Sequence, residues 1–436
     1  MLVKFIDRNR LFFLKIFNLL PAGFQKCVKN FYRQNILKNI LSNAKQECNN
    51  IISYENGVYK ILKLSNSKAK QGVNLIGFPS QEFGLGQHLK NVATAFESAS
   101  IPIAYYDCSF LFMNEYNQKA SIQNLIYNTN IFVCNGDGIA KLFLEFGEEL
   151  FQNKYNIHYG AWEIRDYPVE WIPPLSLVDE YWAMSSFLQK SVSDSAILPV
   201  LHMPYPVEFK IPNKYSRKDF ELPEDKFLYI FTFDMSSVMQ RKNPEAVINA
   251  FYEAFPTEDG VCLVIKMMSK KNLTSHQKEI EKLQKKISAD KRIFIIDELL
   301  ARDQILDLIN CCNVYVSLHR AEGFGIGMAE AMRMGKPVIA TNYSGNTDFT
   351  LSDNSCLVNY QLRAIQPGEY IYEEGKYWAD ADVSEAADYM RKLYHDKEYR
   401  EKISSNAKKY IEENYSADII KNKYISRLKI LGLIRP

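Results

Sequence analysis

The chain has 436 residues, a net charge of +2, 47% hydrophobic residues and 24% charged residues. Since single domains usually contain ~100–200 residues, this length predicts two domains, and the ordinary composition predicts a folded protein. The near-neutral charge argues against a nucleic-acid-binding protein, which carries a strong basic excess. The eight cysteines form no C-x-x-C pair, and the six histidines are scattered. We therefore expect a reduced, cytoplasmic compartment and no metal site.

Residues 1–70 are predicted to form a basic, partly amphipathic extension before the first domain. Residues 1–45 contain nine lysines and arginines against one acidic residue, which leaves the rest of the chain net acidic. The apolar run LFFLKIFNLLPAGF is interrupted by Lys15 and stopped by Pro21, so it falls short of the ~20 apolar residues of a membrane-spanning helix. Apolar residues after Pro21 recur at helical spacing. The resulting basic helix either rests on an anionic membrane surface, with the protein peripheral on the inner face, or packs on the protein with a solvated basic face.

An alternation of short β-rich and helical runs predicts a first Rossmann-like domain over residues 71–210. VNLIGF has the composition of a buried strand, and GQHLKNVATAFESA has helical periodicity. Further strands are predicted at IPIAYYD, NIFVCNG, YNIHYGAW, DEYWAMS and ILPVLHMP, with a helix at AKLFLEFGEELF. This order is typical of a parallel sheet with helices on both faces.

The same alternation of strands and helices begins again after the polar, proline-containing stretch PVEFKIPNKYSRKDFELPEDK, which is the best candidate linker. It predicts a second Rossmann-like domain over residues 211–414 and a final helix at 415–436 that packs back on the first domain. Strands are expected at FLYIFTF, VCLVIKMM, RIFIID, NVYVSLHR and PVIATN, and helices at PEAVINAFYEAF, QKEIEKLQKKI, DQILDLINCC and MAEAMRM. The predicted fold class is α/β, with two doubly wound domains. A cleft between them would lie at the carboxyl ends of the strands, where such sheets bind ligands.

The stretch AEGFGIGMAEAMRMGKPVIA places a glycine-rich turn between Glu322 and Glu330, which are separated by seven residues. A strand precedes the turn and a short helix follows it. The glycines let the backbone approach a ligand closely, and the N–H groups at the start of the helix favour a phosphate. The Glu330 carboxylate suits a vicinal diol such as a ribose, and Glu322 is expected to face the same cleft. Together they suit a nucleoside diphosphate that carries a hydroxyl-rich group.

The segment EGFGIGMAE resembles the E-x7-E motif of retaining glycosyltransferases of family four, which have the GT-B fold. Similar agreement is found at NLIGFPSQEFGLGQHLKNVATAFESASIPI, FTFDMSSVMQRKNPEAVINAF, YWADADVSEAADYMRKLYHD and AKKYIEENYS, so the resemblance covers roughly residues 73–436. It implies a nucleotide-sugar donor in the second domain and an acceptor in the first. It also implies that Glu330 holds the ribose and that Glu322 lies beside the donor sugar. The backbone amides expected to contact the sugar hydroxyls and the diphosphate are those of Gly323, Phe324 and Gly325.

Three cations are candidates for stabilising the leaving group, because a departing nucleoside diphosphate develops negative charge that fixed cations can offset. They are Lys242, Lys266 and Arg241, each of which could instead be a solvated side chain. Many members of the family carry an arginine six residues before the lysine, and Ser236 stands there in this chain. Lys266 or Arg241 would then compensate.

Candidates in the first domain are fewer. Gly84 and Gly86 either approach the diphosphate across the cleft or form an ordinary strand-to-helix turn. His158, Trp162 and Glu163 near a strand end are acceptor-site candidates, although core packing explains His158 and Trp162 better. In the second domain, His319 lies next to the glycine turn, either at the site or as a satisfied core histidine.

No D-x-D pair occurs at a strand end, and DAD at 380–382 lies in the closing section, so we expect no metal and no cofactor. The resemblance implies a retaining hexosyltransferase that uses a UDP-, GDP- or dTDP-linked sugar. Its acceptor would be a glycan or lipid-linked glycan in surface polysaccharide biosynthesis of the O-antigen, lipopolysaccharide or capsule kind. The alternatives are a non-catalytic glycosyltransferase-like partner subunit or glycan-binding protein and, with less support, a GT-B epimerase or phosphorylase.

Overall fold

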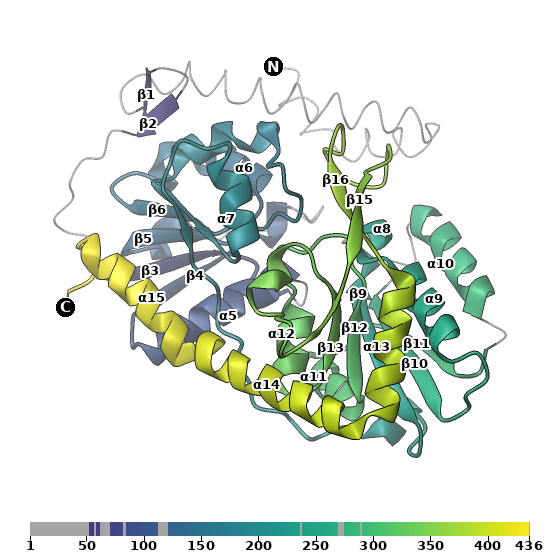
Figure 1. The fold of residues 1–436 in the computed structure, drawn as a ribbon. Coiled ribbons are helices and arrows are strands. Elements are labelled where there is room, and N and C mark those ends of the chain that lie inside the picture. The colour runs from purple at the N-terminus through teal and green to yellow at the C-terminus, as the bar shows by residue number, and fades with distance from the viewer. Residues whose placement is uncertain are drawn as a thin grey trace.

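The computed structural model describes residues 52–55, 58–61, 70–81, 84–111, 121–235, 238–268, 274–287 and 290–435. The described chain contains two parallel sheets of six strands each, flanked by helices (Figure 1). The predicted α/β class with two Rossmann-like domains is therefore confirmed. The basic helical extension and membrane contact predicted within residues 1–45 lie outside the described residues.

The first sheet has the strand order β4-β3-β5-β6-β7-β8. Its strands are β3 (Lys70–Gly77), β4 (Ile103–Asp107), β5 (Tyr127–Phe132), β6 (Tyr155–His158), β7 (Glu180–Ala183) and β8 (Val200–His202). The crossovers contain α5 (Gly84–Ser98), α6 (Gly136–Phe146) and α7 (Ser186–Ser193). The last six residues of β3 are all buried, because helices cover both faces of the sheet, and this explains its nearly continuous apolar sequence.

The second sheet has the order β11-β10-β9-β12-β13-β14. Its strands are β9 (Phe227–Asp234), β10 (Val261–Met268), β11 (Ile293–Asp297), β12 (Val314–Ser317), β13 (Val338–Thr341) and β14 (Cys356–Val358). Its helices are α8 (Met239–Lys242), α9 (Pro244–Ala254), α10 (Thr274–Ile287), α11 (Arg302–Cys311), α12 (Ile326–Arg333) and α13 (Val383–His395). The strand order reverses between β9 and β12, which is where a doubly wound sheet binds its ligand.

Two long helices at the end of the chain join the domains. They are α14 (Lys397–Tyr415) and α15 (Ala417–Ile430), and they run along the lower side of the molecule from the second domain to the first (Figure 1). The Tyr424 ring of α15 lies 5.3 Å from the Phe96 ring of α5, and its hydroxyl donates to the Pro204 carbonyl at 2.8 Å. The final helix thus packs on the first domain.

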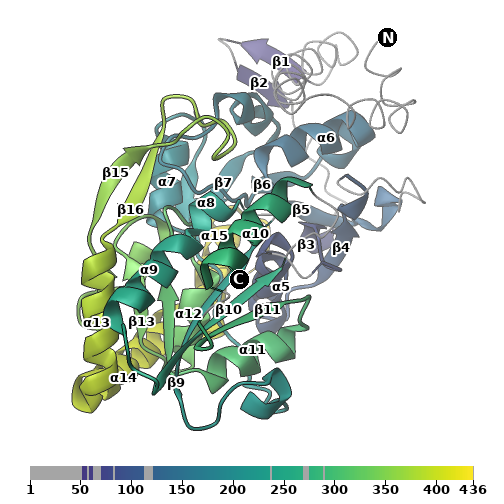
Figure 2. The ribbon, with the colours of Figure 1, turned by 90° about the vertical axis from the view of Figure 1, so that its right-hand side faces the viewer.

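Two antiparallel ribbons are elements that the sequence analysis did not predict. One is formed by β1 (Ile52–Glu55) and β2 (Val58–Ile61), and the other by β15 (Tyr360–Ala364) and β16 (Tyr377–Ala381). The second ribbon extends away from the second sheet (Figure 2). The loop between its strands reaches the first domain, where the Tyr370 ring lies 5.6 Å from the Trp162 ring. Within the described ranges, no helix is long and apolar enough to cross a bilayer.

Candidate active site

A cavity of about 520 Å³ lies between the two domains. Residues that follow β3 and β5 line one side, and residues at the end of β9 and after β12 line the other. The lining contains most of the predicted site residues, namely Gly84, Trp162, Glu163, Arg241, Lys242, Lys266, Glu322, Gly323, Phe324, Gly325 and Glu330. Strand ends from both sheets thus bring residues that are distant in sequence to one place.

The glycine turn after β12 is tightly packed, which explains its composition. Gly325 has a φ of +97°, a conformation that side-chain-bearing residues rarely adopt. A Cβ atom on Gly327 would lie 2.4 Å from the Tyr315 hydroxyl, and one on Gly323 would lie 3.1 Å from the Trp162 carbonyl oxygen of the other domain. The Ser185 hydroxyl, which caps α7, donates to the Gly323 carbonyl at 2.7 Å. The turn therefore forms part of the contact between the domains.

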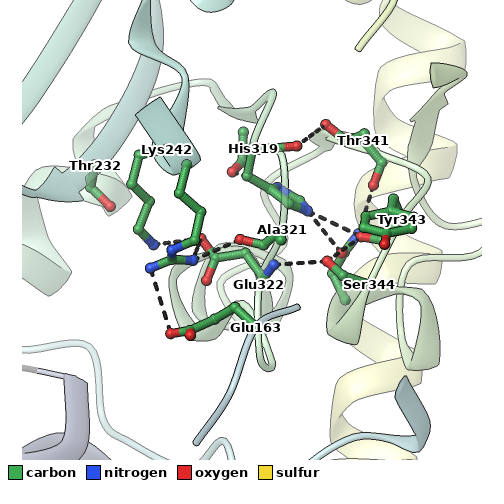
Figure 3. A network of polar contacts seen from close by, with 12 residues as sticks. Glu163, Thr232, Lys242, His319, Ala321, Glu322, Thr341, Tyr343 and Ser344 are labelled. Atoms are coloured by element: carbon green, nitrogen blue, oxygen red, sulfur yellow. Dashed lines mark hydrogen bonds and ion pairs between the residues drawn. The ribbon is translucent and has the colours of Figure 1, made fainter. Parts of the chain in front are cut away.

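Glu322 is the centre of a buried charge network (Figure 3). Its Oε1 atom lies 2.5 Å from Nζ of Lys242 and 3.3 Å from Nη1 of Arg241. Its backbone N–H donates to the Ser344 hydroxyl at 2.8 Å. Burial disfavours the charged carboxylate, but Lys242 and Arg241 outweigh burial and lower the pKa of Glu322 to about 2. Glu322 is therefore ionised at every physiological pH.

Arg241 connects this network to the first domain. Its guanidinium is 3% exposed, donates to the Ala321 carbonyl at 2.7 Å, and lies 3.7 Å from Oε1 of Glu163. Glu163 accepts a second contact at its other oxygen, where the Tyr370 hydroxyl donates at 2.5 Å. A continuous polar chain thus runs from Tyr370 through Glu163, Arg241 and Glu322 to Lys242.

Glu330 and Lys266 lie elsewhere on the cavity wall. Glu330 is 3% exposed, and its Oε1 atom accepts a hydrogen bond from Nη2 of Arg302 at 2.5 Å. Lys266 lies near the carboxyl end of β10 and is 7% exposed. Burial lowers the pKa of Lys266, although Asp234 and Asp297 oppose the change. An anion in the cavity would restore the ordinary preference of this amine for its charged form.

Two predicted residues do not reach the cavity lining. His158 is fully buried, and its Nε2 atom donates to the Cys134 carbonyl at 2.8 Å. Burial lowers the pKa of His158 to about 4, so the ring is neutral. Gly86 is also buried, and a Cβ atom there would lie 2.1 Å from the Gln81 carbonyl oxygen, so this glycine serves packing. We therefore do not retain these two residues as site candidates.

Two further predictions have different outcomes. His319 is fully buried with ring contacts to the Ser317 hydroxyl at 3.0 Å and the Asn346 side-chain oxygen at 2.9 Å, as expected of a satisfied core histidine. Ser236, where the family arginine is missing, lies outside the described residues. In DAD, Asp380 pairs with Arg320 at 2.9 Å and Asp382 caps α13.

The structure adds residues to the lining that the sequence analysis missed. They include His88, Tyr205, Thr232, Asp234, Arg302, Tyr315 and Tyr370. Thr232 and Asp234 lie at the carboxyl end of β9, so the rule that ligands bind at strand ends could have identified them. Tyr370 could not have been found in this way, because it belongs to the loop of the β15–β16 ribbon. No group of three or more metal-ligating side chains occurs in the described ranges, and metal independence stays a prediction.

Comparison with known proteins finds a family model that matches part of the chain. Residues 214–410 match the family model of glycosyl transferases group 1. No curated protein matches the sequence.

Several solved structures share the fold. HepE from Anabaena, solved in complex with UDP-glucose, superposes with a TM-score of 0.59 and 14% identity over 83% of this chain and 100% of HepE. Sucrose-phosphate synthase from Thermosynechococcus elongatus superposes with a TM-score of 0.61 and 12% identity over 83% of this chain and 99% of the synthase. Both likenesses extend over most of this chain. The chain therefore has the two-domain GT-B fold of these structures, and its residues 214–410 are similar to glycosyl transferases group 1.

Proposed function

We propose that the protein transfers a hexose from a nucleoside-diphosphate sugar to a glycan or lipid-linked glycan, with retention of anomeric configuration and without a metal ion. The observation that carries this proposal is the network of Glu322, Lys242 and Arg241 in the same cavity as Glu330 and the glycine turn. A cavity with fixed cations, a buried carboxylate and closely packed backbone suits a diphosphate joined to a sugar and a ribose.

The donor would lie along the wall formed by the second domain. Lys242 and Lys266 line the cavity and would face the diphosphate, together with the N–H groups at the start of α12. Glu330 would accept hydrogen bonds from the ribose hydroxyls. HepE was solved with UDP and with UDP-glucose, which makes a UDP-linked sugar the first donor to test, with GDP and dTDP sugars next.

The chemical step would be a front-face displacement at the anomeric carbon. The bond from this carbon to the diphosphate oxygen breaks, and a bond to the acceptor oxygen forms on the same face. The acceptor proton passes to the departing phosphate oxygen. Glu322 is a poor candidate for a covalent nucleophile, because its carboxylate already forms ion pairs with Lys242 and Arg241. Its expected role is to position these cations beside the donor sugar.

The acceptor would bind on the side of the first domain, beside Trp162 and Glu163. Glu163 is the more informative of the two, since its carboxylate lines the cavity and is held between Arg241 and Tyr370. A carboxylate fixed in this way suits a sugar hydroxyl. An acceptor phosphate at the same position would meet the like charge of Glu163.

A role in surface polysaccharide biosynthesis at the inner membrane face rests on the basic sequence of residues 1–45. The full chain should float with anionic vesicles of mixed phosphatidylglycerol and phosphatidylcholine, and a variant without residues 1–45 should remain in the soluble fraction. Equal flotation of the two proteins would contradict the membrane contact and leave glycosyl transfer unaffected.

The deciding experiment measures the melting temperature of the full chain against UDP, GDP, dTDP, CDP and ADP, with and without a chelator. A ligand at 100 times its dissociation constant stabilises the folded state by ~2.7 kcal/mol, which corresponds to a shift of several degrees. We expect one nucleotide to stabilise the protein regardless of chelator, and Glu330→Ala to weaken that shift. No shift with any nucleotide would contradict the proposal. Release of the nucleoside diphosphate only when acceptor is present would separate transfer from epimerase or phosphorylase activity.

A further inference from the structure

We infer that Arg302 is a positioning residue for nucleotide binding: it holds the Glu330 carboxylate in the orientation that recognises both hydroxyls of a ribose. This inference rests on the proposed function, since it assumes that a nucleotide occupies the cavity beside Glu330.

Glu330 needs a cation because its carboxylate is almost completely buried. The residue is 3% exposed, on the second turn of α12. A carboxylate removed from water is costly unless it is paired and hydrogen-bonded. Nη2 of Arg302 donates to Oε1 of Glu330 at 2.5 Å. Arg302 thereby supplies both a positive charge and a hydrogen bond to this buried carboxylate.

Arg302 is itself held from two sides. It is the first residue of α11, and it lines the cavity next to the apolar residues Leu299, Leu300 and Ile305. The central carbon of its guanidinium lies 5.7 Å from the centre of the Phe209 ring, in the segment that connects the two domains. A planar guanidinium that stacks on a ring and donates to a carboxylate has little remaining rotational freedom.

This arrangement has a consequence for ligand selection. The two oxygens of one carboxylate can accept from the two adjacent hydroxyls of a ribose only when the carboxylate plane is fixed. A 2′-deoxynucleotide, dTDP included, would then leave one acceptor of a buried group unpaired, which corresponds to roughly a tenfold to hundredfold loss of affinity. Without Arg302 the carboxylate can rotate and take up water, so the missing hydroxyl would matter less.

The experiment compares dissociation constants of nucleoside diphosphates and their 2′-deoxy counterparts by isothermal titration calorimetry of the full chain. The pairs are UDP with 2′-deoxy-UDP, GDP with 2′-deoxy-GDP, and ADP with 2′-deoxy-ADP. We expect the wild type to prefer the ribonucleotide of its own base at least tenfold. Arg302→Ala should reduce this preference to threefold or less.

Two further variants separate positioning from general damage. Arg302→Lys keeps the charge and loses the planar fork, so its preference should also fall. Arg333→Ala removes an arginine from the same helix as Glu330, where it pairs with Glu412 at 2.5 Å, and it should keep the wild-type ratio. Should Arg302→Ala fail to fold, the ratio in Arg302→Lys decides.

The outcomes distinguish this inference from the proposed function. Binding of a ribonucleotide with an unchanged preference in the Arg302 variants would overturn the inference and support nucleotide binding. A wild type that binds a nucleotide without preferring ribose would overturn the inference and the role of Glu330. A wild type that binds none of the nucleotides would overturn the proposed function and, with it, this inference.

Discussion

Lys242 and Glu322 form a buried ion pair in which Nζ lies 2.5 Å from Oε1. The pair joins the end of α8 to the glycine turn that follows β12. Arg241, the preceding residue of α8, contacts the same carboxylate oxygen at 3.3 Å. The cation expected to bind the diphosphate is therefore paired with a carboxylate of the protein. A donor diphosphate would share or replace that partner on entering the cavity.

Substitution of either cavity lysine should impair turnover. Lys242→Ala and Lys266→Ala each remove a positive charge from the wall where the diphosphate is expected, so we predict at least a tenfold loss of kcat, about 1.4 kcal/mol of transition-state stabilisation. Initial rates of nucleoside diphosphate release would measure it. Lys286→Ala is the matched control, because Lys286 pairs with the exposed Glu245 and does not line the cavity. Wild-type rates in both cavity variants would refute their assigned roles.

The low pKa of Glu322 predicts how folding stability depends on pH. The pKa is about 2 in the folded protein against an ordinary value of 4.5, so the ionised carboxylate stabilises the folded state above pH 4.5. This contribution is lost as the pH falls from 4.5 toward 2, and a shift of this size corresponds to about 3 kcal/mol. Glu322→Gln resembles the protonated residue, so its stability deficit should be largest near neutral pH.

Unfolding free energies from urea titrations of the wild type and Glu322→Gln between pH 3 and pH 7 would measure this effect. The difference between the two proteins should shrink steadily below pH 4.5. A difference that stays constant across this range would mean that the ion pairs of Glu322 contribute no net stability.

The sequence was sufficient to predict the site residues whose position follows from the local course of the chain, at the ends of strands and the starts of helices. Glu322 follows the end of a strand and was expected to face the cleft, and Lys242 was expected near the start of the helix PEAVINAFYEAF; both line the cavity. The partnership between Arg241 and Glu163 could not be predicted, because the two residues belong to different domains and only the packing of these domains brings them together. Arg302 was missed because its contact with Glu330 depends on how α11 and α12 pack within the second domain.

His158 and the β15–β16 ribbon show the limits of pattern reading. His158 ends β6, as an acceptor-site residue would, but its ring is enclosed by the Cys134 carbonyl and the Tyr181 ring. A strand-end position therefore does not decide whether a side chain reaches the cavity. The ribbon was not predicted, because Tyr360, Leu362 and Tyr377 remain exposed and give no core signal, and only the residues of β16 were assigned, to the closing section.

One contact between the two domains should depend on the carboxylate of Asp348. Asp348 accepts from the backbone N–H of Ser186 at 2.7 Å and from the Ser186 hydroxyl, and it lies 3.2 Å from Nε2 of His202. Burial opposes ionisation, but the hydrogen bonds from His202 and Ser186 lower the pKa of Asp348. The contact should therefore weaken as the pH falls through this lowered pKa.

Asp348→Asn should lower the melting temperature by several degrees at pH 7, because a hydrogen bond to a charged group contributes about 1.5–3 kcal/mol. Differential scanning calorimetry would measure the change, and it would also reveal whether the two domains begin to unfold separately. Asp353→Asn is the control, since Asp353 is exposed on the same stretch of chain. Equal melting of the two variants would show that Asp348 does not hold the domains together.

Substitution of Tyr370 tests the acceptor side of the cavity and leaves the residues on the donor side unchanged. Its hydroxyl donates to Glu163 at 2.5 Å from a loop of the other domain, so Tyr370→Phe removes one hydrogen bond to a carboxylate and little volume. We predict that the KM for an acceptor glycan, identified by array screening, rises about tenfold. The affinity for the nucleotide should not change, since Tyr370 lies beside Glu163 and not beside Glu330. Tyr377→Phe is the matched control, because Tyr377 is 52% exposed on the same ribbon. An unchanged acceptor KM, or an equal loss of nucleotide affinity, would remove Glu163 from the acceptor side of the cavity.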